Sequence, residues 1–121
     1  MSDKPMRIKI RADLEEIYWG RVNMGVEQKW NTHYLERMTE LQGEWLEVET
    51  KYCFEDQFNT IGTKQDPNGF RITASWVSEI DFGDLGIDGW KKKVTDYYAE
   101  AWPGRNKPAF GHVDYIVKRQ S

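Results

Sequence analysis

Three glutamates, Glu44, Glu47 and Glu49, are the residues whose types and spacing most suggest chemistry. They lie along or beside a stretch in which apolar and polar residues alternate, so Glu47 and Glu49 share one face of an expected strand. Paired carboxylates can transfer protons or bind a divalent cation. A metal site would also need His or Asp from a second element at a recognisable spacing, and the sequence provides none. We therefore predict no metal ion and no cofactor.

An earlier alternating stretch explains these glutamates without chemistry. Residues 6–11, MRIKIR, place Arg7, Lys9 and Arg11 on the solvent face of an expected strand. If that strand lies beside the glutamate strand, cross-strand ion pairs account for both sets of charges. We expect this structural pairing rather than an acid and base pair.

The histidines and the cysteine do not form a catalytic motif. His33 falls in the first turn of an expected helix, and His112 lies in an expected strand. Cys53 comes from an apolar strand without a charged activator, whereas a nucleophile needs a base within hydrogen-bond reach. A hydrolase would require Glu47, Glu49 and His112 to converge in one cleft. We therefore predict no catalytic residues and a protein that is not an enzyme.

Three consecutive lysines near the start of an expected helix are the strongest sign of a ligand. They oppose the helix dipole, which favours negative charge at that end. Together with nearby aromatic rings they could bind a nucleotide or a single-stranded nucleic acid by charge and stacking. The alternative is a solvated helix face with its rings in the core. The predicted anion-binding residues are Lys91, Lys92, Lys93, Tyr97, Tyr98, Arg105 and Lys107.

A second group of aromatic residues lies in and around an irregular segment between residues 15 and 31. Exposed rings on the loops of a rigid scaffold are typical anchors of a protein interface, including an interface with a second copy of the chain. Filling of the core explains the same residues equally well. The predicted interface residues are Tyr18, Trp19, Arg21, Trp30 and Trp45.

Length and charge limit the classes of function. A chain of 121 residues predicts a single domain, 1–121. The formal net charge is −3, with ten Lys/Arg against fifteen Asp/Glu in residues 1–83 and seven against five in residues 84–121. This balance argues against a general nucleic-acid binder, which would be basic overall. With one cysteine, no signal peptide and no apolar run of membrane length, the expected location is the cytoplasm, without membrane contact.

Hydrophobic periodicity predicts an α+β fold with a small, strongly curled antiparallel sheet and one short helix. The helix is expected from Thr32 to Gly43 and is followed directly by a strand from Trp45 to Phe54. In that strand Leu46, Val48, Tyr52 and Phe54 share one face. Asp66-Pro67-Asn68-Gly69 predicts a hairpin turn before a strand over residues 70–76, and residues 78–80 suggest a single helical turn.

Beyond Asp84 the sequence predicts an extension of one helix and one strand. Trp90, Val94, Tyr97 and Ala101 follow helical spacing, so an amphipathic helix is expected over residues 89–102. Residues 110–118 alternate and predict a final strand. We expect residues 6–82 to form the sheet core and residues 84–121 the extension.

Four stretches in this order resemble a group of short phage and bacterial proteins of unknown role. They are R-x-D-L (residues 11–14), E-R-M-x-x-L-x-G (residues 36–43), the alternating strand at residues 46–52, and W-V-S-E-I (residues 76–80). Those proteins are small Src-homology-3-like β-barrels, and the resemblance covers residues 6–82. It implies such a barrel and a phage or mobile-element origin, and it implies no activity. The chain departs from the pattern over residues 14–32 and from Asp84 onward.

Two functions remain from these observations. The first is a phage or mobile-element accessory protein that binds and blocks a host protein, most concretely an inhibitor of a bacterial defence system, similar to anti-CRISPR proteins. The second is a binder of an anionic nucleotide or single-stranded nucleic acid through the C-terminal extension. The first predicts a contiguous exposed aromatic patch around Trp19 and Trp30. The second predicts that Lys91–Lys93 and Arg105 converge on a pocket with Tyr97 or Tyr98.

Overall fold

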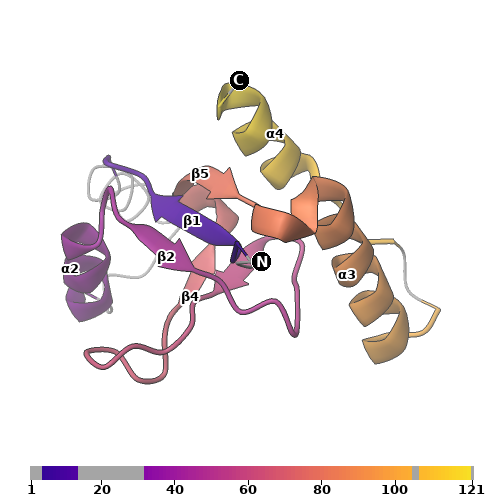
Figure 1. Cartoon of the computed structure of the whole chain (residues 1–121), viewed down its shortest axis with the longest axis horizontal. Coiled ribbons are helices and arrows are strands. Elements are labelled where there is room, and N and C mark those ends of the chain that lie inside the picture. Colours follow the sequence, from indigo (N-terminus) through magenta and orange to yellow (C-terminus); the bar gives the residue numbers. More distant parts are fainter. Residues whose placement is uncertain (1–3, 14–31, 105–106, 121) are drawn as a thin grey trace.

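The computed structural model describes residues 4–13, 32–104 and 107–120, and its fold is α+β, as predicted. In Figure 1 the short strands lie between helix α2 on one side and helices α3 and α4 on the other. The strands are β1 (Arg7–Ile10), β2 (Trp45–Glu47), β3 (Gln57–Asn59), β4 (Arg71–Thr73) and β5 (Val77–Asp81). The helices are α2 (Thr32–Glu40), α3 (Gly86–Ala101) and α4 (Gly111–Gln120), with 3-10 turns η1 (Ala74–Trp76) and η2 (Gly83–Leu85).

The strands form two small antiparallel sheets instead of a closed barrel. One sheet has the order β2-β1-β5, and the other is the β3-β4 hairpin. A single bridge between Val48 and Thr60 connects the end of β2 to the end of β3. The predicted turn is confirmed, because the Gly69 N–H donates to the Asp66 carbonyl at 3.0 Å and Gly69 has φ +64°. A side chain at Gly69 would meet the Thr60 carbonyl, so this turn requires glycine.

Alternation correctly predicts which face of β1 and of residues 70–76 is buried. The predicted strand over residues 70–76 is nevertheless too long, because only Arg71–Thr73 is strand and Ala74–Trp76 is the 3-10 turn η1. Ile8 and Ile10 are at most 1% exposed, whereas Arg7 and Lys9 between them remain accessible. Residues 72, 74 and 76 are likewise buried. These side chains form the core with Met38 of α2, Trp90 and Val94 of α3, and Val113 of α4. The two C-terminal helices therefore belong to the same core as the sheets.

The predicted helical turn at residues 78–80 is wrong, because these residues lie in strand β5. Lys9 is paired with Glu79, and Ile8 with Ile80, in an antiparallel ladder to β1. The free edge of β1 supplies hydrogen-bond partners that lie some 70 residues away in sequence, and local spacing carries no sign of them.

The predicted final strand at residues 110–118 is also wrong, because Gly111–Gln120 is helix α4. Its apolar residues alternate and several are β-branched, a pattern typical of a strand. Val113 and Ile116 are nevertheless both buried at a helical spacing of three, while Tyr115 is 62% exposed. Packing of this helical face against β5 overrides the local preference.

Helix α4 also closes the outer edge of β5. The Gln120 side chain accepts from the Ile80 N–H at 2.8 Å and donates to the Ile80 carbonyl at 3.1 Å. An unpaired strand edge exposes backbone groups to other chains, and here a glutamine amide takes the place of a neighbouring strand. Gln120 therefore protects this edge of the sheet.

We expect Gln120→Ala to lower the free energy of unfolding by about 1–2 kcal/mol, because two backbone groups of the buried Ile80 lose their partners. Urea unfolding followed by circular dichroism measures this loss. Gln120→Glu is the matched control, since it keeps the acceptor for the Ile80 N–H and removes the donor. An alanine variant as stable as the parent chain would show that the Gln120 amide does not hold this edge.

None of the helices in the described part of the chain combines the length and the apolar character needed to cross a membrane.

Candidate interaction surface

Five aromatic side chains form a contiguous group where α3 meets the segment after β2. The ring of Tyr97 is the centre of this aromatic cluster. Its centroid lies 5.3 Å from that of Tyr52, 5.4 Å from Phe54, 5.9 Å from Trp102 and 6.3 Å from Tyr98. Tyr98 and Trp102 also contact each other edge to face at 5.2 Å. Such tilted and edge-to-face pairs are the favoured arrangements of aromatic rings.

The cluster arises because the strand after Gly43 is shorter than predicted. Alternation placed Tyr52 with Val48 on the buried face and Cys53 on the other. The structure has the reverse: Cys53 is 4% exposed and Tyr52 is 49% exposed. Strand β2 ends at Glu47, and the chain then bends, so the alternation of the strand no longer determines the direction of residues 50–54. This bend brings Tyr52 and Phe54 to the outer face of α3.

The cluster is anchored at its base and exposed at its rim. Tyr98 is partly buried, and its hydroxyl accepts from the Glu55 N–H at 3.1 Å. Burial is the main cause that raises the pKa of this tyrosine. Tyr52 and Trp102, in contrast, are 49% and 40% exposed. Both rings are among the exposed large apolar side chains of the described residues, so the rim is an accessible apolar surface.

The three lysines predicted to bind an anion point to three different partners. Lys91 forms an ion pair with Asp114 at 2.8 Å, and Lys92 forms one with Asp96 at 2.7 Å. The Lys93 ammonium lies 3.4 Å from the Thr50 carbonyl, at the border of the aromatic cluster.

The other predicted anion-binding residues are divided in a similar way. Tyr97 and Tyr98 belong to the aromatic cluster, Lys107 is exposed, and Arg105 lies outside the described residues. On the opposite border of the cluster, Lys51 places its ammonium 5.5 Å from the ring centroid of Tyr52. The rings are thus bordered by Lys51 and Lys93, while the first two lysines of the triplet are already paired with acids.

Of the predicted interface residues, the structure describes Trp45. Tyr18, Trp19, Arg21 and Trp30 lie outside the described residues.

Trp45 lies on the outer face of the three-stranded sheet and is 37% exposed. The charged groups of Arg7 and Lys9 lie 4.8 and 4.6 Å from the centroid of its ring. These cation–π contacts hold the indole against β1.

The cations of β1 form ion pairs, as predicted, but the predicted glutamate partners are wrong. Arg7 pairs with Asp81 at 2.7 Å and Lys9 with Glu79 at 3.4 Å, both on β5. The Arg7 guanidinium is the main cause that lowers the pKa of Asp81. Arg11 pairs with its near neighbour Asp13 at 3.0 Å. Sequence alternation identified the cationic face of β1, but β1 has two neighbouring strands, and alternation does not say which of them supplies the acids.

No cluster suited to a metal ion or a thiolate nucleophile occurs in the described part of the chain. There, no group of three or more His, Cys, Asp or Glu side chains comes together in a way that could hold a metal. Cys53 is buried, and burial is the main cause that raises the pKa of its thiol, which disfavours the reactive thiolate.

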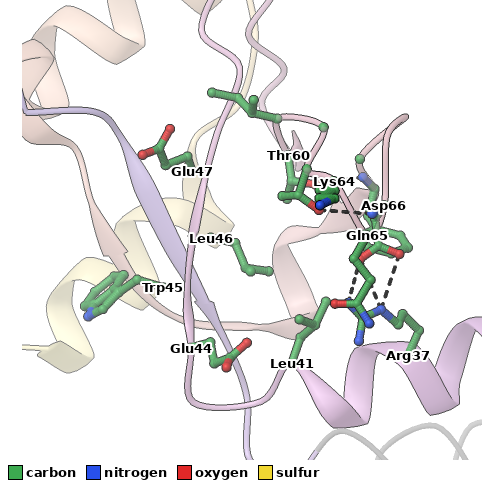
Figure 2. Close-up of a pocket in the computed structure, with 15 residues that line it drawn as sticks. Arg37, Leu41, Glu44, Trp45, Leu46, Glu47, Thr60, Lys64, Gln65 and Asp66 are labelled. Carbon is green, nitrogen blue, oxygen red and sulfur yellow. Dashed lines mark hydrogen bonds and ion pairs between the residues drawn. The ribbon is translucent and has the colours of Figure 1, made fainter.

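A hollow of about 620 Å³ lies between β2 and the loop of residues 60–69 (Figure 2). Leu46 points into it from β2, and Arg37 of α2 lies at one end beside Asp66. This volume is within the range of about 300–1,000 Å³ typical of ligand sites. The hollow and the aromatic cluster are both surface features of the described residues that could receive a partner.

Only the aromatic cluster could be predicted in part from the sequence. Tyr97, Tyr98 and Trp102 follow helical spacing, which placed them on one stretch of α3, but Tyr52 and Phe54 were assigned to the core. The hollow has no signature in the sequence, because it forms where two strands separate. Comparisons with protein families, with curated proteins and with solved structures found no match for this chain.

Proposed function

We propose that this chain is a non-enzymatic binding protein that docks onto another protein through the aromatic cluster. The observation that carries this proposal is the position of the rings. Four of them surround and contact Tyr97, and Tyr52 and Trp102 remain 49% and 40% exposed. Tyrosine and tryptophan supply a large share of the binding energy at protein interfaces, because they bury much area at little cost in side-chain entropy. Lys51 and Lys93 at the border favour a partner with carboxylates around an apolar centre.

The most concrete version is a phage or mobile-element accessory protein that blocks a host protein, for example a component of a bacterial defence system. Its support is the resemblance of residues 6–82 to short phage and bacterial proteins with a small Src-homology-3-like barrel. The bridge between Val48 and Thr60 extends the strand order to β5-β1-β2-β3-β4, which is compatible with such a curled sheet. A chain of 121 residues whose described part contains no group of side chains that could hold a metal ion suits a stoichiometric blocker.

A second candidate function is the binding of a single-stranded nucleic acid at the same rings. The observation in its favour is the placement of the ammonium groups of Lys51 and Lys93 beside the cluster. Aromatic rings bordered by cations are the usual platform for bases and their phosphates. The net charge of −3 and the ion pairs of Lys91 and Lys92 count against it.

We expect Tyr52→Ala/Trp102→Ala to weaken the captured complex by at least about thirtyfold, which corresponds to roughly 2 kcal/mol of hot-spot energy. To test this, the tagged chain is used to capture partners from nuclease-treated bacterial lysate, and the captured proteins are identified by mass spectrometry. The affinity of each variant is then measured with the purified partner. Because both rings are partly exposed, the fold should remain intact by circular dichroism.

Tyr115→Ala is the matched control, since Tyr115 is an exposed ring on α4 outside the cluster. Equal affinity of the parent chain, the double variant and this control for the captured protein would overturn the proposal. A labelled oligothymidylate whose saturable binding is lost in Lys51→Glu/Lys93→Glu would replace it with the second candidate. For the anti-defence version, expression of the chain should restore plaque formation on a defended strain, and the double variant should not.

A further inference from the structure

The hollow forms where the pairing between the chain after β2 and the chain after β3 stops. The Glu49 N–H donates to the Asn59 carbonyl at 2.8 Å, and the Ile61 N–H donates to the Glu47 carbonyl at 3.0 Å. The next step of this antiparallel pairing would join Trp45 to Thr63. The Thr63 N–H instead donates to the Asp66 carbonyl at 3.0 Å, within its own loop. From this point the loop turns away from β2, and the space between them is the hollow.

The backbone of Trp45 faces this space. In an antiparallel pair, successive residues direct their N–H and C=O groups to opposite edges of the strand. Val48 donates to the Met6 carbonyl at 2.9 Å, and Leu46 is opposite Ile8, so Val48 and Leu46 bond toward β1. The backbone groups of Trp45 therefore point to the other edge, at the place where Thr63 has turned away. A short stretch of strand edge is thus presented inside a hollow.

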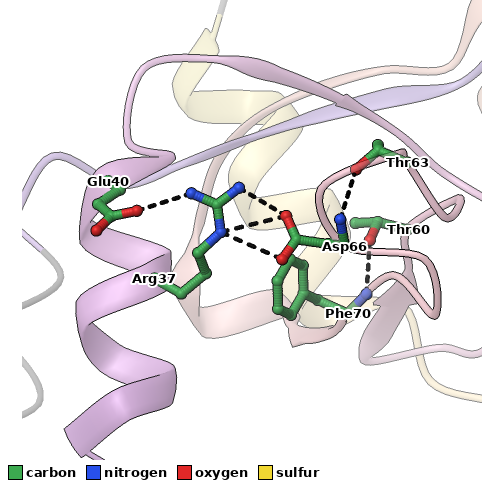
Figure 3. A network of polar contacts seen from close by, with 6 residues as sticks. All are labelled: Arg37, Glu40, Thr60, Thr63, Asp66 and Phe70. Atoms are coloured by element: carbon green, nitrogen blue, oxygen red, sulfur yellow. Dashed lines mark hydrogen bonds and ion pairs between the residues drawn. The ribbon is translucent and has the colours of Figure 1, made fainter.

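An ion pair holds the loop in its separated position (Figure 3). Arg37 of α2 donates to both carboxylate oxygens of Asp66, with its closest contact at 2.6 Å, and its remaining amino group binds Glu40 at 2.7 Å. The Asp66 N–H donates to the Thr63 hydroxyl at 3.0 Å. The opening is therefore maintained by charged contacts from a helix, so the folded chain keeps it without a bound ligand.

The surroundings of the strand edge combine an apolar floor with acidic side chains. Leu41, Leu46 and Phe70 supply apolar surface. Glu44, which directly precedes β2, and Glu47, on the outer face of β2, also line the hollow, together with the cation Lys64. Within the residues that the structure describes, neither of these two carboxylates takes part in a hydrogen bond or an ion pair. A ligand strand that pairs with this edge would place every second residue on the outer face, beside Glu47.

We propose that the hollow binds an extended peptide segment of a partner protein, in which an apolar residue is flanked by Lys or Arg. The segment would pair its backbone with Trp45 and continue the strand arrangement where Thr63 leaves it, a known mode of peptide recognition at sheet edges. Its apolar side chain rests on Leu46 and Phe70, and its basic neighbours, which alternation turns to the opposite face, lie beside Glu47. This site is separate from the aromatic cluster and does not depend on the function proposed there.

The test uses three synthetic heptapeptides with acetylated and amidated ends. The first alternates lysine with valine and leucine, the second has glutamate in place of lysine, and the third is the lysine peptide with every backbone amide N-methylated. Each is titrated into the full-length chain labelled with ¹⁵N and followed by NMR. We expect the lysine peptide to shift the Trp45 amide saturably, and the other two to bind at least about tenfold more weakly, because they lose the charge match or the backbone pairing.

Three double variants make the outcome decisive. Glu44→Lys/Glu47→Lys should invert the preference toward the glutamate peptide. Glu36→Lys/Glu100→Lys makes the same change in net charge at exposed positions outside the hollow and should leave the preference unchanged. The Tyr52→Ala/Trp102→Ala variant should bind the lysine peptide like the parent chain, which separates this site from the aromatic cluster.

Three results would overturn the inference. They are the absence of a saturable shift at Trp45, equal binding of the N-methylated peptide, and a peptide preference that charge reversal in the hollow does not change. Light scattering tests a second copy of this chain as the occupant. A dimer that persists in the presence of the lysine peptide would assign the hollow to self-association instead.

Discussion

Replacement of Trp90 by alanine is expected to lower the free energy of unfolding by about 3–5 kcal/mol, the usual loss for a large aromatic residue in a core. Trp90 is 1% exposed, and its ring contacts Phe58, Phe82 and Phe110, with centroids 6.2, 5.7 and 5.5 Å away. These three residues come from β3, from the segment after β5 and from the segment before α4. One side chain thus joins both sheets to the C-terminal extension.

Thermal unfolding followed by far-ultraviolet circular dichroism measures this effect. For a chain of this length, a loss of about 3–5 kcal/mol corresponds to a fall of about 12–20 °C in Tm. Trp90→Phe keeps an apolar ring in the same place, so its fall in Tm should be less than half that of Trp90→Ala. If Trp90→Ala melts within a few degrees of the parent chain, the extension does not share the core of the sheets.

Replacement of Arg37 by alanine is expected to lower the free energy of unfolding by about 1.5–3 kcal/mol, the range for hydrogen bonds to charged groups. Exposed ion pairs contribute little, because water screens them and both side chains lose freedom. Arg37 and Asp66 differ from such pairs, since their side chains are only 19% and 22% exposed and the guanidinium contacts both carboxylate oxygens. The pair also joins α2 to a loop that is 29 residues away in sequence. Without Arg37, the loop loses its attachment to α2 and the Asp66 carboxylate loses its partner.

A double-mutant cycle isolates this interaction. Arg37→Ala, Asp66→Ala and the double variant are compared by urea unfolding, and a coupling energy of about 1.5–3 kcal/mol is expected. Lys92 and Asp96 provide the matched control, because their ion pair is equally short at 2.7 Å while their side chains are 78% and 63% exposed. Their coupling should be about 0.3–0.5 kcal/mol. Similar couplings for the two pairs would show that partial burial does not strengthen the Arg37 contact.

The same ion pair connects stability to the proposed peptide site. The turn around Asp66 keeps Thr63 from pairing with Trp45, and Arg37 holds that turn against α2. When the pair is removed, the loop is free to move toward β2 and narrow the hollow. Arg37→Ala should therefore weaken peptide binding even though Arg37 does not face the peptide backbone.

Local sequence patterns correctly predicted the elements that depend mainly on their own residues. The amphipathic spacing of α2 and α3, the alternation of β1 and of residues 70–76, and the turn at Gly69 each follow from a face or a dihedral angle that the residues themselves specify. The α+β class could be inferred from these parts. The aromatic content and the basic triplet also drew attention to α3, where the exposed cluster is found.

The sequence by itself determined these faces and turns, because side-chain period and glycine dihedrals are properties of a few neighbouring residues. Only the tertiary structure decided that residues 77–81 are a strand and residues 111–120 a helix, since β1 and the core supply the partners of both. It likewise decided the direction of Tyr52, the acids that pair with β1 and the separation at Thr63. Each of these depends on segments distant in the chain, and their meeting is a property of the folded molecule.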